Sequence, residues 1–359
     1  MTNVREVTAL ALVNHSRRIP GAEHLRLVNL ATIYAPTLQN KYAVSAINVR
    51  SFPLPKDGSY EKGYVGPSTI VAAMKAAMKA RAPLVLEIAE TEYEYVGPQK
   101  WAAEHGFANG FEMIMAHVKA AAKEIGFDLP LAVHFDHGKT EEYMKQAVAA
   151  GFTSIAMDGG DQADWNALVS KARSWVEYCH QRGVTVEGEI ETVGAENPTE
   201  PAEAIQFYNE TGVDVVVVTL PKNEHGADKG KSVLDQARLL EVRRALPVTV
   251  PVNLHGGSGF SDDDLRAAVD AGAAQKVNYA TNVAKAMFAA SPAALEALNQ
   301  AAGTVGKSAK DARKSIYKLA DYYRKMGAEE VARMEGAGEK EIYTLMLTLR
   351  TDNTARFYS

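Results

Sequence analysis

The sequence contains a single cysteine, Cys179, among its 359 residues, and this scarcity excludes a disulfide framework. It has no basic excess either, since the formal net charge is −5, so a nucleic-acid partner is not expected. The apolar patch ALALV near the N-terminus is too short to span a bilayer, and no signal-like cleavage site follows it. These absences predict a soluble, cytoplasmic protein without a membrane partner.

The chain also lacks a linker rich in serine, glycine and proline, and short β-branched runs alternate with helical patterns instead. Strands are expected at 42–48, 83–89, 129–136, 153–158, 184–190, 213–220, 248–254 and 274–280. Helices are expected at 68–80, 111–126, 141–151, 166–183, 201–212, 233–246 and 263–272.

Eight strand–helix units without a linker predict one domain, a (β/α)8 TIM barrel that spans residues 42–290. The strands are mostly apolar, as in VDVVVV at 213–218, which is typical of parallel strands covered on both faces. A doubly wound open sheet is the alternative, but no glycine-rich turn follows an early strand. Residues 291–359 are expected to form a helical extension that wraps the barrel or contacts a partner subunit.

Histidines follow three of the expected strands at the end where barrel active sites lie. The stretch LAVHFDHGKT contains Asp136 and His137, His225 follows the sixth strand, and His255 ends the seventh. Three imidazoles with an open fourth position form the ligand set of a catalytic zinc site. A histidine taken alone is more often a hydrogen-bonded core or surface residue. His15, His24, His105, His117 and His180 are interpreted in that second way.

Carboxylates accompany these histidines. Asp158 ends the fourth strand, while Glu187 and Glu189 lie two residues apart on the fifth and therefore point to the same side. Burying two carboxylates is costly unless each is paired or binds a metal. We expect Glu187 to meet a lysine or arginine inside the barrel and Glu189 to lie near the metal.

Two glycine-rich loops each begin at one of these histidines. In HGGSGFSDDD, Ser261 and Asp264 form a capping box at a helix start, and a glycine-rich loop before a helix N-terminus is a phosphate site. In HGADKG, Lys229 lies between two glycines. A divalent metal beside a phosphate can bind a ketone and its neighbouring hydroxyl and stabilise an enediolate. Asp136 is then placed to move a proton on the hydroxyl whose C–C bond breaks.

The motifs AVHFDHGKT, AGFTSIAMDGG, VTVEGEIETVG, HGADKG, LHGGSGF and KVNYATN occur in order between Tyr42 and Asn282. With them the chain resembles the class II, metal-dependent fructose-bisphosphate aldolases, including the branch of tagatose-bisphosphate aldolases. The resemblance implies a homodimer or homotetramer, a catalytic zinc or another divalent metal, a monovalent cation, and retro-aldol cleavage of a phosphorylated sugar that releases dihydroxyacetone phosphate.

The resemblance also assigns roles to residues. It implies that His137, His225 and His255 bind the metal, and that Asp136 transfers the proton at the C4 hydroxyl. Asp158 and Glu189 fall where family members hold a second or alternative metal position. The positions matching phosphate or substrate contacts are Asn48, Gly226, Lys229, Gly230, Gly257, Ser258, Asn278 and Thr281.

The chain departs from the family pattern around the substrate. The loop after the fifth strand is the short VGAENPTEP, so Glu196 is the candidate for proton exchange on the dihydroxyacetone carbon. Ala89 replaces a serine, Asp228 an aromatic residue and Asn282 an acid. These changes affect the prediction of the particular substrate more than that of the reaction class.

Arg50 stands where the family commonly has asparagine or a small residue, and the insertion SFPLPKDGSYEKGYVG follows it. By strand alternation Arg50 lies on the same side as Asn48 and borders the pocket. Its planar fork suits an anionic group at the end of the substrate away from the metal. The alternative is a surface ion pair with an acid of the insertion, such as Asp57 or Glu61.

Several functions therefore remain open. Fructose 1,6-bisphosphate is the default substrate, and another acidic sugar phosphate is a second possibility. A metal-dependent sugar epimerase, a binding or regulatory protein on a degenerate barrel, and a Schiff-base aldolase using Lys276 are the alternatives. For Lys276 we favour an inward-facing structural role, because it alternates with Asn278 on the eighth strand.

Overall fold

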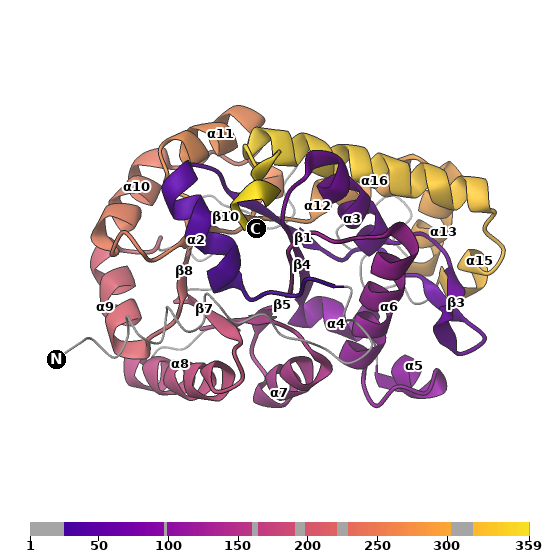
Figure 1. Cartoon of the computed structure of the whole chain (residues 1–359), viewed down its shortest axis with the longest axis horizontal. Helices are drawn as coiled ribbons and strands as arrows, with labels where there is room; N and C mark the ends of the chain where they lie inside the picture. The colour runs from indigo at the N-terminus through magenta and orange to yellow at the C-terminus, as the bar shows by residue number, and fades with distance from the viewer. Residues whose placement is uncertain are drawn as a thin grey trace.

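The computed structural model describes residues 25–96, 99–159, 164–190, 198–220, 229–302 and 319–358. Its parallel strands close into a barrel in the order β1-β10-β9-β8-β7-β6-β5-β4 (Figure 1). They are β1 (Val44–Asn48), β4 (Leu84–Ala89), β5 (Leu131–Gly138), β6 (Ser154–Asp158), β7 (Thr185–Glu189), β8 (Val215–Val218), β9 (Val252–Leu254) and β10 (Lys276–Tyr279). The predicted (β/α)8 barrel is confirmed, and each of these strands lies within its expected range or within two residues of it.

The expected helices form the outer ring of the barrel. They are α3 (Thr69–Ala80), α6 (Gly110–Ile125), α7 (Glu141–Ala150), α8 (Trp165–His180), α9 (Pro201–Thr211), α10 (Gln236–Ala245) and α11 (Asp262–Asp270). Helix α12 (Thr281–Ala289), for which no range was expected, follows β10. The predicted cap of α11 is present, because Ser261 Oγ accepts the Asp264 N–H at 3.1 Å. This cap satisfies one of the backbone donors left without a partner at a helix start.

Helix α2 (Leu30–Asn40) covers the N-terminal end of the barrel, and the sequence did not predict it. Ile33 and Tyr34 join a buried cluster with barrel residues that include Val44, Ala46, Val85, Ala132 and Val215. The hydroxyl of Tyr34 donates to Glu187 Oε1 inside the barrel at 2.6 Å. Tyr358, in the C-terminal η3 (Thr354–Tyr358), donates to the Ile33 carbonyl at 2.8 Å, so both ends of the described chain meet here (Figure 1).

The residues after the barrel are helical where the structure describes them. They form α13 (Pro292–Ala302), α15 (Ala320–Tyr323) and α16 (Ala328–Thr348). Helix α16 lies along α3 and α12 on the outside of the barrel (Figure 1). The approach is close, because a Cβ on Gly338 would lie 2.8 Å from Met287 Cγ. The extension therefore wraps the barrel. No helix of the described segments is long and apolar enough to cross a membrane.

Elements that the sequence did not predict follow β1 and β4. The insertion after Arg50 forms an antiparallel hairpin of β2 (Leu54–Lys56) and β3 (Ser59–Val65). After β4 come the short helices α4 (Glu90–Val96) and α5 (Gln99–Glu104). Helix α4 matters for function, since its first turn lies at the C-terminal end of the barrel.

A charged cluster fills the barrel interior below the active-site end. Lys276 Nζ lies 2.5 Å from Glu87 Oε1 and 2.9 Å from Glu187 Oε2, and all three side chains are fully buried. The expectations that Glu187 meets a lysine and that Lys276 faces inward are confirmed. His134 points into the same interior, where its Nδ1 lies 2.7 Å from Ser154 Oγ. Burial, and then the charge of Lys276, hold the pKa of His134 well below its ordinary value, so this histidine is neutral.

Candidate active site

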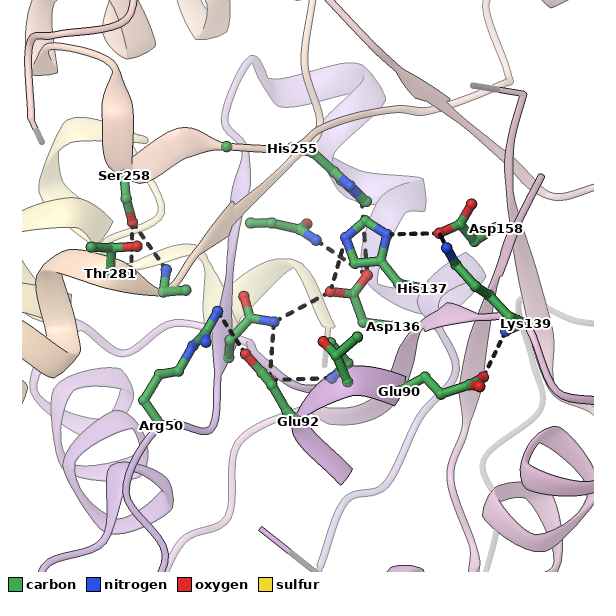
Figure 2. Close-up of a pocket in the computed structure, with 16 residues that line it drawn as sticks. Arg50, Glu90, Glu92, Asp136, His137, Lys139, Asp158, His255, Ser258 and Thr281 are labelled. Carbon is green, nitrogen blue, oxygen red and sulfur yellow. Dashed lines mark hydrogen bonds and ion pairs between the residues drawn. The ribbon is translucent and has the colours of Figure 1, made fainter. Parts of the chain in front are cut away.

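A cavity of about 310 Å³ opens at the C-terminal end of the barrel. Its walls come from the residues that end β1, β4, β5, β6, β9 and β10 and from the loops that follow them (Figure 2). Catalytic groups lie at this end in enzymes with this fold, because the loops after the strands converge there. The cavity therefore coincides with the region where the sequence placed the site.

Asp136, His137 and His255 come together in this cavity. His137 Nε2 lies 3.7 Å from Asp136 Oδ2, and His255 Nε2 lies 4.0 Å from Asp136 Oδ1. The two imidazole rings are 4.7 Å apart and nearly perpendicular, at 77°.

The backbone of β5 explains how two consecutive residues face one site. Side chains normally alternate across a strand, so Asp136 and His137 would point in opposite directions. The pairing of β5 with β6 shifts register between Phe135 and Gly138. His137 has a φ of 50°, which is rare for a residue with a Cβ. Strained backbone of this kind concentrates at functional sites, where the surrounding fold holds it.

Two further carboxylates surround His137. Its Nδ1 lies 3.1 Å from Glu189 Oε2 and 3.6 Å from Asp158 Oδ2, while His255 Nδ1 lies 3.7 Å from Glu189 Oε1. Burial alone would lower the pKa of His137, but the carboxylates of Asp136 and Glu189 outweigh it and raise this pKa well above its ordinary value. Burial, together with the nearby Asp158 and Asp136, raises the pKa of Glu189 to about 7 against the influence of His137.

These donors fit a divalent metal ion. One ligand atom from each of Asp136, His137 and His255 lies within 4.8 Å of the others, and the same holds for His137, Asp158 and Glu189. Neutral imidazole nitrogens and carboxylate oxygens are the donors that zinc and related divalent ions accept. The third histidine expected as a ligand, His225, lies outside the described residues, as do Gly226 and Glu196.

The loop after β9 meets the start of α12 at one wall of the cavity. Ser258 Oγ accepts the backbone N–H groups of Ala280 and Thr281 at 3.0 and 3.1 Å (Figure 2). Gly257 has no room for a side chain, because a Cβ there would overlap Val277 Cγ1. Gly256, Ser258, Ala280 and Thr281 line the cavity. Backbone N–H groups at a helix N-terminus suit a phosphate.

Two predicted phosphate contacts lie elsewhere in this structure. Lys229 Nζ pairs with Asp262 Oδ1 at 2.8 Å, at the start of α11, and Gly230 is exposed with a φ of 76°. Both lie outside the described lining of the cavity. By contrast, Asn278 lines the cavity, and its Nδ2 is 3.5 Å from Asp136 Oδ1.

Arg50 and Asn48 also line the cavity, and both contact Glu92 of α4. Arg50 Nη2 lies 2.6 Å from Glu92 Oε1, and these side chains are 10% and 1% exposed. Glu92 Oε2 accepts the Ala89 N–H at 3.2 Å and lies 3.5 Å from Asn48 Nδ2. Asn48 Nδ2 is in turn 3.2 Å from Asp136 Oδ2, so polar contacts run from Arg50 to Asp136 (Figure 2).

The partner of Arg50 corrects one expectation. The sequence suggested a surface pair with Asp57 or Glu61 as the alternative to anion binding, but Arg50 is buried and its partner is Glu92. The sequence also missed Glu90 and Lys139, both of which line the cavity. The signal available was the acidic ETE directly after the second expected strand, at the end where barrel sites lie.

A barrel with this arrangement at its C-terminal end belongs to a known class of lyases. A sequence model of the family described as "Fructose-bisphosphate aldolase class-II" matches residues 28–339. The chain therefore belongs to the class II fructose-bisphosphate aldolase family and is a carbon–carbon lyase. The match begins before the motifs, at residues that lead into α2.

Individual relatives agree with this assignment. The fructose-bisphosphate aldolase of Staphylococcus aureus is 27% identical over 270 residues, which are 72% of this chain and 84% of that protein. The Geobacillus stearothermophilus fructose-bisphosphate aldolase is 27% identical over 266 residues, which are 72% and 82% of the two chains. Among solved structures, the YdjI aldolase from Escherichia coli K12 has a TM-score of 0.64 at 20% identity, covering 92% of this chain and 99% of that one. Fructose-bisphosphate aldolase from Campylobacter jejuni has a TM-score of 0.63 at 19% identity, with 94% and 97% covered.

Proposed function

We propose that this enzyme is a zinc-dependent aldolase that reversibly cleaves a ketose phosphate to dihydroxyacetone phosphate and an aldehyde. The observation that carries the proposal is the position of Asp136 between His137 and His255 in the cavity. Class II aldolases depend on a divalent metal, and the donors around His137 suit one. Fructose 1,6-bisphosphate serves as the reference substrate, after the family.

In this proposal His137, His225 and His255 hold the metal, and Asp158 and Glu189 offer a second or alternative position. A bound divalent ion supplies Lewis-acid stabilisation to the ketone and its neighbouring hydroxyl. Asp136 takes the proton of the C4 hydroxyl as the C3–C4 bond breaks. The amides of Asn48 and Asn278 lie on its two carboxylate oxygens, at 3.2 and 3.5 Å, and they hold the carboxylate in one orientation.

The phosphate of the dihydroxyacetone half binds at the N-terminus of α12. The Ser258 hydroxyl accepts the N–H groups of Ala280 and Thr281 at the cavity wall, and its own hydrogen is left to donate to the phosphate at this positive end of the helix. After the family pattern we assign Gly226, Lys229 and Gly230 to the same phosphate, and Glu196 to proton exchange on the dihydroxyacetone carbon. The assignment of Lys229 requires its pair with Asp262 to open when substrate binds. A homodimer or homotetramer is part of the proposal, as is a monovalent cation near the metal.

A Schiff-base mechanism is the main competitor, and the environment of Lys276 opposes it. A nucleophilic lysine needs a neutral amine, which requires a lowered pKa. Burial would lower the pKa of Lys276, but Glu187 and Glu87 outweigh burial and raise it instead. Lys276 therefore stays protonated between two carboxylates.

The test is a screen of zinc-loaded protein against phosphorylated ketoses, read by release of dihydroxyacetone phosphate. We expect a chelator to abolish release and borohydride with substrate to leave it intact. Inactivation by borohydride in the presence of substrate, without inactivation by the chelator, would indicate the Schiff-base route. Interconversion of sugar epimers without release of dihydroxyacetone phosphate would indicate the epimerase.

A further inference from the structure

The buried Arg50–Glu92 pair forms a wall of the cavity that the metal chemistry does not use. Arg50 offers a planar set of donors, and Glu92 offers acceptor oxygens beside it, at 2.6 Å. Both residues line the cavity, although only 10% and 1% of their side-chain surfaces are exposed. A hydroxyl both donates and accepts hydrogen bonds, so a donor and an acceptor fixed side by side match a polyhydroxyl chain.

The position of this pair relates it to one half of the substrate. Asn48 links Glu92 to Asp136 through contacts of 3.5 and 3.2 Å. In the proposed function Asp136 acts at the C4 hydroxyl, so the groups beyond it meet the carbons that leave as the aldehyde. Ser258 and the N-terminus of α12 serve the other half, which carries the phosphate.

The charges of the described lining disfavour a second phosphate. Two side-chain cations other than imidazoles are present in this part of the cavity, and a carboxylate accompanies each. Arg50 lies against Glu92, and Lys139 Nζ lies 3.5 Å from Asp158 Oδ2. Glu90 adds another carboxylate to the wall that carries Glu92. A phosphate dianion placed here would meet two carboxylates and an arginine whose charge is already balanced.

We infer that the substrate is a ketose 1-phosphate whose aldehyde half is an uncharged polyol, read by the Arg50–Glu92 pair. This rests on the proposed function and narrows its substrate class. The sequence suggested that Arg50 binds a distal anion, and the partner on α4 changes that role to hydroxyl recognition. Arg50 remains a substrate-binding residue in both cases.

The first test needs no variant. Zinc-loaded enzyme is given fructose 1-phosphate and fructose 1,6-bisphosphate, which differ only in the distal phosphate. We expect kcat/KM to favour the monophosphate by roughly 10-fold or more, the scale of a like-charge penalty. Binding of two unreactive polyols, glucitol 1-phosphate and glucitol 1,6-bisphosphate, is measured by calorimetry as a readout independent of turnover. The monophosphate should bind more tightly.

The second test removes the carboxylate charge and keeps its shape. Glu92→Gln removes the negative charge beside Arg50, so the ratio of kcat/KM for bisphosphate over monophosphate should rise roughly 10-fold. The kcat/KM values for both substrates should also fall by a common factor, because Glu92 contacts Asn48. The ratio of the two values cancels this common loss and reports specificity. Glu104→Gln is the matched control. Glu104 is half exposed on α5 and 3.9 Å from Lys100, so this change should leave the ratio unaltered.

The outcomes separate this inference from the proposed function. Cleavage of both ketoses with a preference for the bisphosphate, and no change of ratio in Glu92→Gln, overturns the inference and leaves the aldolase standing. No cleavage of either, with tighter binding of glucitol 1-phosphate, supports the Arg50–Glu92 site and overturns the aldolase. Absence of both binding and cleavage overturns both. If Glu92→Gln does not fold, the preference of the wild-type enzyme between the monophosphate and the bisphosphate decides the inference.

Discussion

His137 and His255 are proposed metal ligands. Asp136 lies beside them, and its proposed role is to transfer a proton. We predict that Asp136→Ala keeps its fold and its zinc but loses roughly 10²–10⁴ in cleavage rate, the usual contribution of a positioned acid–base group. Single-turnover kinetics and elemental analysis on the same sample measure the two properties. Near-normal turnover with the metal retained would remove Asp136 from the mechanism.

His255 is predicted to be a ligand. His255→Ala should lose both bound zinc and activity, since three protein ligands are the usual minimum of a catalytic zinc site. The control is His180→Ala on α8, where the imidazole pairs with Asp214 at 2.9 Å and not with the cavity residues. That variant should keep full zinc. Full zinc occupancy in His255→Ala by elemental analysis would contradict the ligand assignment.

At the scale of residues, sequence reasoning found the groups that follow strands and missed those that depend on packing. Asp136, His137 and His255 were predictable because strand ends converge at one face of a barrel. Glu92 was not predictable, because nothing in the sequence ETEYEY shows that the first turn of α4 places Glu92 against Arg50. The sequence also could not show why both Asp136 and His137 face the site, because the register shift between Phe135 and Gly138 is visible only in the structure.

Among the elements, β10 carries the charged centre of the barrel. We predict that Lys276→Met lowers the free energy of unfolding by about 3–5 kcal/mol, because Glu87 and Glu187 would stay buried without their cation. Denaturant unfolding at neutral pH measures this. Lys229→Met, at a half-exposed surface pair with Asp262, should change stability by about 1 kcal/mol or less. Equal small losses in both variants would show that the interior pair is dispensable.

Helix α6 buries His117 against the hairpin formed by β2 and β3. Its Nε2 lies 2.7 Å from Ser68 Oγ, and Tyr60 and Tyr64 pack on its ring. Burial lowers the pKa of His117 from 6.5 to about 3. Between these values the unfolded chain binds more protons than the folded one, so this residue lowers stability as pH falls from 6.5.

We therefore predict that replacing His117 with Gln flattens the decline of Tm between pH 6.5 and pH 3, measured by thermal unfolding. Of the groups facing this site, Glu335 accepts the Ser68 N–H, and burial raises its pKa. It contributes in the opposite direction, and the substitution leaves it in place. An unchanged pH slope in the variant would show that His117 does not control acid stability.

The periodic elements of the barrel could be predicted, and the irregular ones could not. Strands such as 213–220 are mostly apolar, and helices such as 111–126 carry a clear apolar stripe. Helix α2 contains Pro36 and gains its stability from burial under the barrel rather than from its own sequence. Helix α4 has only seven residues, fewer than an isolated helix needs.

At the scale of the whole molecule, the metal should stabilise the fold. A ligand that binds only the folded state at about 100 times its Kd adds about 2.7 kcal/mol to the free energy of unfolding. We predict that a chelator lowers the Tm of the zinc-loaded enzyme and that added zinc restores it. His255→Ala, in the same assay, should show no response to the chelator. A Tm that is insensitive to zinc in the wild-type enzyme would contradict a resident metal.

The meeting of α2 with η3 has a consequence for synthesis on the ribosome. The bond from Tyr358 to Ile33 joins residues 325 positions apart, and β1 finds one of its two neighbours only in β10. A nascent chain that has made β1 therefore carries an open strand edge, and an α2 without its η3 contact, until much later segments emerge. Such edges attract other chains. Expression yield should therefore depend on translation speed and on chaperones that shield the early strands.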